Sequence, residues 1–325
     1  MSLLGFLGKL VDRIAPEIFE FNPYNLHPQV ATAVAYCDGR QWRELGRLYE
    51  SLDHFQTHLI TEGLSEIIKD DAFFDEWCEK SRGYYLPHLL RGSLLLKRAW
   101  VYRGYGRADD VEEQRWPKFY DALEESLDSL TAAMNTNPDI IEAPARAIRT
   151  LMGLSAEWDD IDAMHARLKA TGQPSFFGEV SYLIASCEKW LGSHDKMFEF
   201  ARNTYAGANH PSYAGLIAEA HFEKHMYLRW IDDDADGAAA YFDDPAIQSE
   251  ISEASETLLA DAAERPAHET LEAHGYFAMV FSIAEQFKMA APHFEIMGTA
   301  VSRHPWEFDD VEFLARSRRK SLAYL

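Results

Sequence analysis

The sequence has little of three features that would place it in another class: cysteine, turn-forming residues and long apolar runs. Its three cysteines include no Cys-x-x-Cys pair, which argues against a disulfide framework or a cysteine zinc site and is typical of a reducing compartment. Only 18 glycines and 13 prolines occur in 325 residues, which argues against an all-β chain of tight turns. No run of 18 apolar residues is present, so we expect no stable membrane insertion.

The N-terminal residues do not change this expectation. Residues 1–10 are largely apolar, but they lack the basic start and small-residue cleavage site of a signal peptide, and Lys9, Asp12 and Arg13 interrupt the segment. We therefore expect a cytoplasmic protein. The apolar spacing predicts a short helix that ends at Pro16, within an N-terminal helix and extended cap over 1–27. Docking of this helix on a membrane surface is a further alternative, although it carries little positive charge.

Common enzyme motifs are also missing. There is no Gly-x-Ser-x-Gly elbow, no phosphate-binding loop that ends in Gly-Lys-Ser/Thr, and no dinucleotide fingerprint. We predict no catalytic residue and no cofactor, and therefore a protein that is not an enzyme.

Positive charge is scarce and unevenly distributed. The chain has 31 basic and 53 acidic residues, a net charge of −22. Residues 1–100 carry 14 acidic and 11 basic groups, whereas residues 201–300 carry 17 acidic and 5 basic groups. Such a field repels nucleic acid and attracts basic proteins or peptides. The simpler alternative is that the acidic groups only maintain solubility.

The apolar residues recur with helical spacing, and no alternating strand pattern emerges. The pattern predicts an all-α fold, a right-handed α-α superhelix (solenoid) of irregular antiparallel helix pairs in a single domain over 1–325. The expected helices cover 28–37, 42–52, 58–80, 86–102 and 117–135, then the pairs 140–153 with 158–170, 176–191 with 194–206, 212–231 with 246–263, and 267–286 with 289–303. Residues 311–325 are expected to form a short C-terminal helix with a basic tail, which holds Arg316, Arg318, Arg319 and Lys320.

Two segments share one spacing. Residues 130–138 and 297–305 both read apolar residue, two positions, alanine, apolar residue, three positions, proline. The alanine permits close approach of a neighbouring helix, and the proline stops the helix. The spacing predicts that both segments end a helix.

This spacing resembles the end of a tetratricopeptide repeat, mainly over 277–305 and 126–138. Phe277, Val280 and Ala300 stand where that motif has a tryptophan, a leucine and an alanine, and Ser126, Leu130 and Ala133 match its second helix. The sequence departs from the motif at Phe281, in place of glycine, and at His293, in place of alanine. The resemblance implies a helical-repeat protein that presents a concave surface to other proteins.

One loop has the spacing of a calcium site. Asp232, Asp234 and Asp236 occupy positions 1, 3 and 5, glycine holds position 6, and Asp243 falls at position 12. Position 12 is normally the longer glutamate, and Ala239 is small for position 8. We keep these four aspartates as weak metal candidates and favour a solvated acidic loop, so no metal site is predicted.

Histidine pairs are a second metal candidate. His54 with His58, and His221 with His225, stand four residues apart and so share a helix face. Neither pair has the glutamate beside the first histidine that zinc peptidases use as a base. We favour structural or surface roles for both pairs.

The leading interpretation is a non-enzymatic scaffold that binds a protein or peptide, the partner being basic because the later helix pairs are acidic. One alternative is an immunity or inhibitor protein that neutralises a basic bacterial toxin, with association accelerated by charge. Another is a metal-dependent enzyme of unknown reaction. The eight tryptophans are expected mostly in the core, with a few lining a groove.

Overall fold

The protein is built from helices. The computed structural model describes residues 21–70, 72–104, 106–308 and 311–325, and within these ranges it contains helices and no strand, so the all-α prediction is confirmed for them. The helix expected near the N-terminus and most of the 1–27 cap lie outside the described residues. None of the described helices is both long and apolar enough to cross a membrane.

The helices follow one another with short connections. In chain order they are α2 (Val30–Asp38), α3 (Trp42–Glu50), α4 (His54–Ile67), α5 (Ala72–Lys80), α6 (Tyr85–Arg103), α7 (Arg115–Thr136), α8 (Glu142–Gly153), α9 (Trp158–Ala170), α10 (Phe176–Ala185), α11 (His194–Ala206), α12 (Gly215–Trp230), α13 (Ala235–Ala240), α14 (Pro245–Asp261), α15 (Leu271–Ile283), α16 (Phe287–Met297) and α17 (Val311–Leu322).

Several helix boundaries differ from the expectations, and two of them have a local reason. The helix expected over 58–80 is two helices, α4 and α5, and α4 begins earlier because Asp53 and Gln56 form a capping box there. The helix expected over 176–191 ends at Ala185. The chain then turns so tightly that a Cβ on Gly192 would lie 2.1 Å from the Ser186 carbonyl oxygen. The helix α13 was not expected.

The two segments with shared spacing adopt different structures. Residues 130–136 form the last turns of α7, and the chain leaves the helix just before Pro138. The helix expected over 289–303 instead ends at Met297, where Gly298 has a φ of 55° that favours glycine. Ala300 and Pro305 therefore lie in the loop that follows α16, and the prediction that this second segment ends a helix is wrong.

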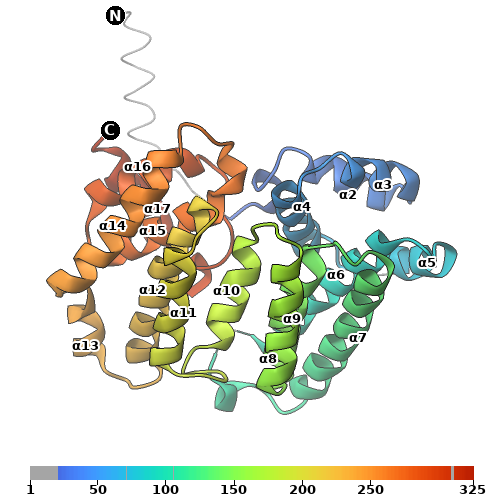
Figure 1. Cartoon of the computed structure of the whole chain (residues 1–325), viewed down its shortest axis with the longest axis horizontal. Helices are drawn as coiled ribbons and strands as arrows, with labels where there is room; N and C mark the ends of the chain where they lie inside the picture. The colour runs from blue at the N-terminus through green and yellow to red at the C-terminus, as the bar shows by residue number, and fades with distance from the viewer. Residues whose placement is uncertain (1–20, 71, 105, 309–310) are drawn as a thin grey trace, which may run out of the picture.

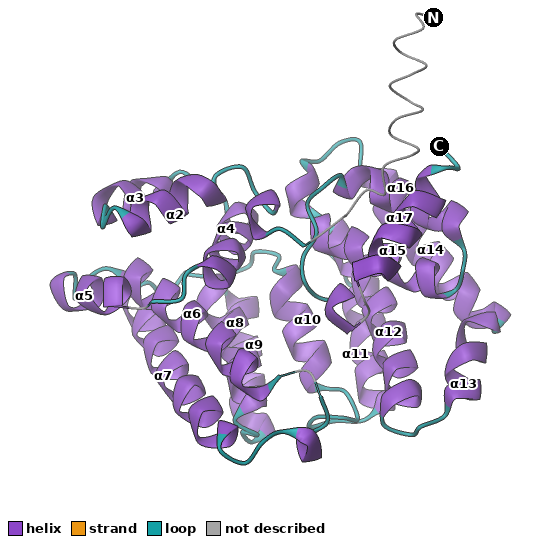
Figure 2. Ribbon diagram, turned by 180° about the vertical axis from the view of Figure 1, so that it is seen from behind, coloured by secondary structure: helices purple, strands orange, loops and turns teal. Residues whose placement is uncertain are grey.

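One row of helices forms the interior. Along this row α6 packs on α8, α8 on α10, α10 on α12 and α12 on α15, while α9 and α11 pack against it from one side (Figure 1). The helix α4 packs on both α6 and α8. Seen from behind, α2 and α3 lie at one end and α14 to α17 at the other (Figure 2). Because α8, α10, α12 and α15 are buried along most of their length, any charged residue on them needs a partner.

Candidate functional site

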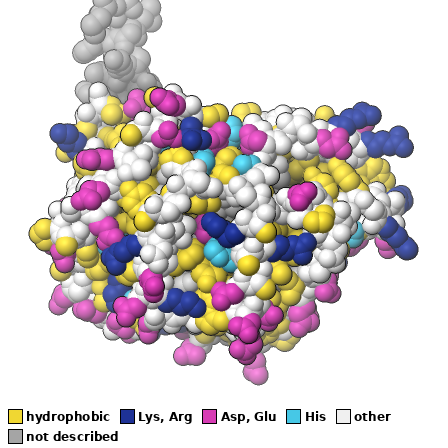
Figure 3. Space-filling view, viewed as in Figure 1, with side chains coloured by type: hydrophobic (Ala, Val, Ile, Leu, Met, Phe, Trp, Pro, Cys, Tyr) yellow, Lys and Arg dark blue, Asp and Glu magenta, His cyan; other side chains and the backbone are white. Residues whose placement is uncertain are grey.

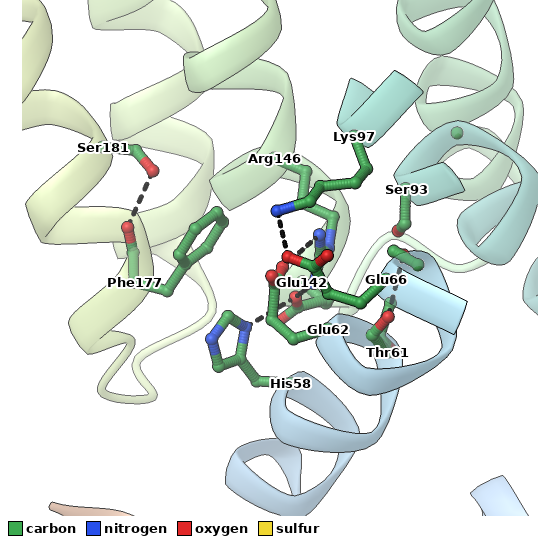
Figure 4. A network of polar contacts seen from close by, with 12 residues as sticks. His58, Thr61, Glu62, Glu66, Ser93, Lys97, Glu142, Arg146, Phe177 and Ser181 are labelled. Atoms are coloured by element: carbon green, nitrogen blue, oxygen red, sulfur yellow. Dashed lines mark hydrogen bonds and ion pairs between the residues drawn. The ribbon is translucent and has the colours of Figure 1, made fainter. Parts of the chain in front are cut away.

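A network of charged side chains lies where α4, α6 and α8 meet (Figure 4). Its centre is Arg146 on α8, whose side chain is 2% exposed. The Nη1 atom of Arg146 lies 2.8 Å from Oε1 of Glu62 on α4, and Nη2 lies 2.7 Å from Oε1 of Glu142 on α8. We use the name central network for seven residues: His58, Glu62, Glu66, Lys97, Glu142, Arg146 and Glu272.

The electrostatics of Glu142 depend on its partners. Burial by itself raises the pKa of this carboxyl, but the charges of Arg146 and His58 and their hydrogen bonds outweigh burial and lower the pKa to about 2. Glu142 and Arg146 stand four residues apart on α8, so they share a face and pair directly. The pair places two opposite charges on a helix that has almost no contact with water.

His58 joins this pair to the C-terminal half of the chain. Its Nδ1 lies 2.9 Å from Oε1 of Glu142, and its Nε2 lies 3.2 Å from Oε2 of Glu272 on α15. Its ring packs on Phe177, with the centroids 4.6 Å apart. Burial lowers the pKa of His58, but the two glutamates more than reverse this and hold the pKa well above its ordinary value. The imidazole is therefore a cation that bridges α4, α8 and α15.

The network extends to the loop that follows α16. Lys97 of α6 is ion-paired with Glu66 of α4. Arg303 contacts the same carboxylate with two nitrogens, Nε at 2.9 Å from Oε1 and Nη2 at 3.2 Å from Oε2. A two-point contact of this kind fixes orientation as well as charge. Residues 237 positions apart in the chain are thus held together.

A small cavity adjoins the network. It has a volume of about 20 Å³ and is lined by residues that include His54, His58, Phe177, Glu269 and Glu272. A cavity of this size has room for one or two water molecules. Water there would meet the polar faces of His54 and Glu272.

The four aspartates singled out from the sequence lie at the end of α12 and beyond it. Asp234 caps α13, since its Oδ1 accepts a hydrogen bond from the Gly237 amide at 2.8 Å. Asp236 is in the first turn of that helix, and Asp243 lies in the 3-10 turn Tyr241–Asp243. The helix interrupts the continuous loop that a calcium site needs. Among the described residues, Asp232, Asp234, Asp236 and Asp243 do not converge as a group of ligands.

The two histidine pairs are held by protein contacts. His221 lies 2.8 Å from the Tyr241 hydroxyl and 3.2 Å from Glu250, and His225 donates to the Ala238 carbonyl oxygen at 3.1 Å. His58 contacts Glu142 and Glu272 in the central network, as described above, while His54 faces the cavity. The structure brings neither pair onto a shared ligand position.

Another histidine pair is buried at the C-terminal end. Nδ1 of His274 lies 2.8 Å from Nδ1 of His293, and Nε2 of His293 lies 2.9 Å from the Ser255 hydroxyl. Burial lowers the pKa of His274 to about 4 and that of His293 well below its ordinary value. Both rings are therefore neutral near pH 7, and one Nδ1–H donates to the other Nδ1.

This pair predicts an acid-sensitive stability. Because the folded pKa lies below the unfolded value of about 6.5, the contribution is present above pH 6.5 and is lost as the pH falls towards 4. The glutamine in His274→Gln keeps a polar group but has no titrating ring. Between pH 7 and pH 4 we therefore expect the variant to lose less unfolding free energy than wild type, by up to about 3 kcal/mol. Urea unfolding at pH 7, 5.5 and 4 measures it. An equally steep loss in wild type and variant would contradict the assignment.

A second feature is exposed rather than buried. The eight tryptophans all lie in the described part of the chain, and Trp230, the last residue of α12, is the one that is exposed, at 46%. Ile231 beside it is 44% exposed. Asp232, Asp233 and Asp234 follow directly and are exposed as well. The acidic loop therefore adjoins an apolar pair on the surface.

Sequence reasoning missed the central network. Glu142 and Arg146 were available as a signal, because they are an oppositely charged pair at helical spacing in the mostly apolar segment 140–153. Their partners on α4 and α15 are distant in sequence, and no spacing links them. Likewise, nothing local marks Trp230 as exposed while Trp77 is buried.

Three comparisons with known proteins complete the description of the site. No family model matches the chain, and neither a curated protein nor a solved structure matches it.

Proposed function

We propose that this chain is a helical-repeat scaffold that binds a basic protein or peptide through the surface at the end of α12. We call this surface the acidic edge and define it by eight residues: Trp230, Ile231, Asp232, Asp233, Asp234, Asp236, Asp243 and Asp244. All eight are exposed. The observation that carries the proposal is the exposed pair Trp230 and Ile231 beside consecutive aspartates.

The apolar pair supplies an anchor. Trp230 and Ile231 are consecutive in the chain and both exposed, and tryptophan is enriched among the residues that dominate binding energy. The guanidinium of Arg229 already lies over the Trp230 ring, 5.2 Å from its centroid. Trp230 thus already takes part in one contact between a cation and an aromatic ring, and a lysine or arginine of a partner would contact the ring in the same way.

The charge around the anchor favours a basic partner. Residues 231–264 contain eleven acidic residues and no lysine or arginine. One contact already shows the chemistry, since Nη2 of Arg107 lies 2.5 Å from Oδ1 of the exposed Asp233. In Figure 3, lysine and arginine side chains stand out at the α3 and α5 end and others are scattered over the rest of the face, whereas residues 231–264 contribute none. Such an asymmetry steers association and orients the partner.

The arrangement of helices supports the scaffold part of the proposal. We infer that the antiparallel pairs continue one another as a right-handed superhelix similar to tetratricopeptide arrays. The support is the unbroken row of contacts from α6 through α8, α10 and α12 to α15. In such an array the ends of successive helices lie side by side along the molecule. The acidic edge begins at one such end, the last residue of α12.

The test is capture by the full chain from native lysate, compared between wild type and Trp230→Ala. Loss of a tryptophan anchor typically costs about 2 kcal/mol, or roughly 30-fold in affinity. We expect the retained proteins to be basic, to be released as salt rises, and to be lost from the variant.

Tyr120→Ala is the matched control, because Tyr120 is a 40% exposed aromatic residue on α7, away from the acidic edge. It is expected to retain the same proteins as wild type. Equal retention by Trp230→Ala, or retention that does not depend on salt, would overturn the proposal.

A further inference from the structure

Two buried glutamates and a histidine meet on the inner side of α12. Glu219 and Glu223 stand four residues apart on this helix and are 0% and 3% exposed. His304, from the loop that follows α16, places its Nε2 3.0 Å from Oε1 of Glu219. Among the described residues this is the group of three potential ligands whose ligand atoms all lie within 4.8 Å of one another.

From this convergence we propose that Glu219, Glu223 and His304 bind a divalent transition-metal ion, with zinc as the best fit. Two ligand atoms at zinc distances of 2.0–2.1 Å lie about 3.0–3.5 Å apart, and the Glu219–His304 distance falls at that value. The ligand oxygen of Glu223 lies within 4.8 Å of the other two ligand atoms, and rotation of its side chain would bring it to zinc-binding distance. Three protein ligands leave one position for water.

An independent observation is the unsatisfied oxygen of Glu219. Its Oε2 is buried and has no hydrogen-bond partner, although the residue is fully inaccessible to water. A carboxylate oxygen in that state is costly. Coordination of a cation satisfies such an oxygen without a proton.

Neighbouring side chains contact the proposed ligands in the way that hydrogen-bond partners usually orient metal ligands. Oε1 of Glu307 lies 3.3 Å from Nδ1 of His304, so the ring nitrogen that faces away from Glu219 has its own carboxylate. Histidine ligands almost always donate that second N–H to such a partner, which orients the ring. Nζ of Lys189 lies 2.6 Å from Oε2 of Glu223 and orients that carboxylate.

Carboxylates outnumber the fixed cations at this site. Glu219, Glu223 and Glu307 carry three negative charges, and the cations beside them are Lys189, which contacts Glu223, and Arg149, whose charge acts on Cys187 and Tyr276 as those of Glu219 and Glu223 do. A metal and a proton therefore compete for His304, and metal binding releases a proton.

The ligand set distinguishes between ions. Mixed imidazole and carboxylate ligands suit zinc, manganese or iron, whereas calcium and magnesium prefer oxygen alone. Cys187 is excluded as a ligand by its own contacts, since its Sγ bonds to the Leu183 carbonyl oxygen and to Sδ of Met197. The His304 side chain is 20% exposed, which gives an ion access from solvent.

The test is a titration of the full chain, stripped with a chelator, with Zn²⁺, Mn²⁺ and Ca²⁺ in separate calorimetric experiments. We expect one Zn²⁺ per chain in the micromolar range or tighter, with release of a proton, and no Ca²⁺ binding in that range. Glu219→Gln keeps the shape of the side chain and is expected to weaken Zn²⁺ binding at least about 100-fold, and Glu307→Gln about 10- to 100-fold.

The matched control is Glu179→Gln. Glu179 on α10 is equally buried and also contacts a histidine and a lysine, but both of its oxygens are partnered, at 2.8 Å by His165 and at 2.9 Å by Lys169. This variant is expected to bind Zn²⁺ within about twofold of wild type, since it lies outside the ligand set.

A readout on wild-type protein covers the case in which Glu219→Gln does not fold. X-ray absorption of the zinc-loaded chain is expected to show nitrogen and oxygen neighbours at about 2.0–2.1 Å, including one imidazole, and no sulfur. Absence of Zn²⁺ and Mn²⁺ binding by the stripped wild type, a shell of several imidazoles, or unchanged binding by Glu219→Gln would each overturn the proposal.

Discussion

Replacing Arg146 by methionine is expected to lower the free energy of unfolding by about 3–5 kcal/mol. Methionine keeps much of the volume but removes the charge, which leaves the buried carboxylate of Glu142 and the partly exposed carboxylate of Glu62 without their nearest cation. Removing one partner of a buried ion pair lowers stability by far more than the pair contributes in total, because the remaining charge stays desolvated. Denaturant unfolding followed by circular dichroism measures the change.

The matched control is Arg43→Met. Arg43 is an exposed arginine on α3, so its loss is expected to change stability by no more than about 0.5 kcal/mol. Adding Glu142→Gln to Arg146→Met is expected to restore part of the lost stability, because it removes one of the two orphaned charges. A loss below about 1 kcal/mol for Arg146→Met, or strict additivity in the double variant, would show that the central network does not act as a unit.

Replacing Phe277 by alanine is expected to cost a similar 3–5 kcal/mol. The Phe277 side chain on α15 is fully buried, and its ring lies nearly parallel to those of His293 and Phe281, with centroids 5.1 Å and 6.1 Å away. The truncation removes a large apolar surface and leaves a cavity that rigid helix neighbours fill only in part. Thermal and urea unfolding report the loss.

Phe277→Leu separates burial from the contact with the ring. It keeps most of the apolar volume and is expected to cost only about 1–1.5 kcal/mol. Val101→Ala is the surface control, since Val101 is 56% exposed, and it is expected to stay within about 0.5 kcal/mol of wild type. If Phe277→Leu were as damaging as the alanine variant, ring stacking on His293 would outweigh volume.

Much of the fold was predictable because the information is local. The segment 140–153 became α8 (Glu142–Gly153), and 158–170 became α9 (Trp158–Ala170), since apolar spacing and stop residues act within a few turns. The predicted helix boundaries were wrong where a tight turn or a capping side chain determines the end of the helix. Ala185 ends α10 because the following residues fold back on Ser186, and Asp234 starts α13 by capping it.

The sites were predictable only in part. The acidic character of residues 231–264 follows from composition, and the exposure of aspartates such as Asp232 and Asp233 follows from their charge. The spacing of Asp232 to Asp243 predicted a loop, but Asp234 satisfies the backbone of a helix instead. Glu219 and Glu223 were visible as a helical pair, yet the contribution of His304 depends on how the loop after α16 folds back onto α12.

The contact between Arg303 and Glu66 has a consequence for cooperativity. In a linear repeat array each unit contacts only its neighbours, so stability is a sum of local terms and the ends fray independently. Here Arg303, in the loop that follows α16, contacts Glu66 on α4, 237 positions earlier in the chain. Segments that are distant in sequence are thus joined directly. The contacts of Glu66 cannot be completed until residue 303 has been synthesised, and we expect loss of the Arg303 contact to loosen both α4 and the loop that follows α16.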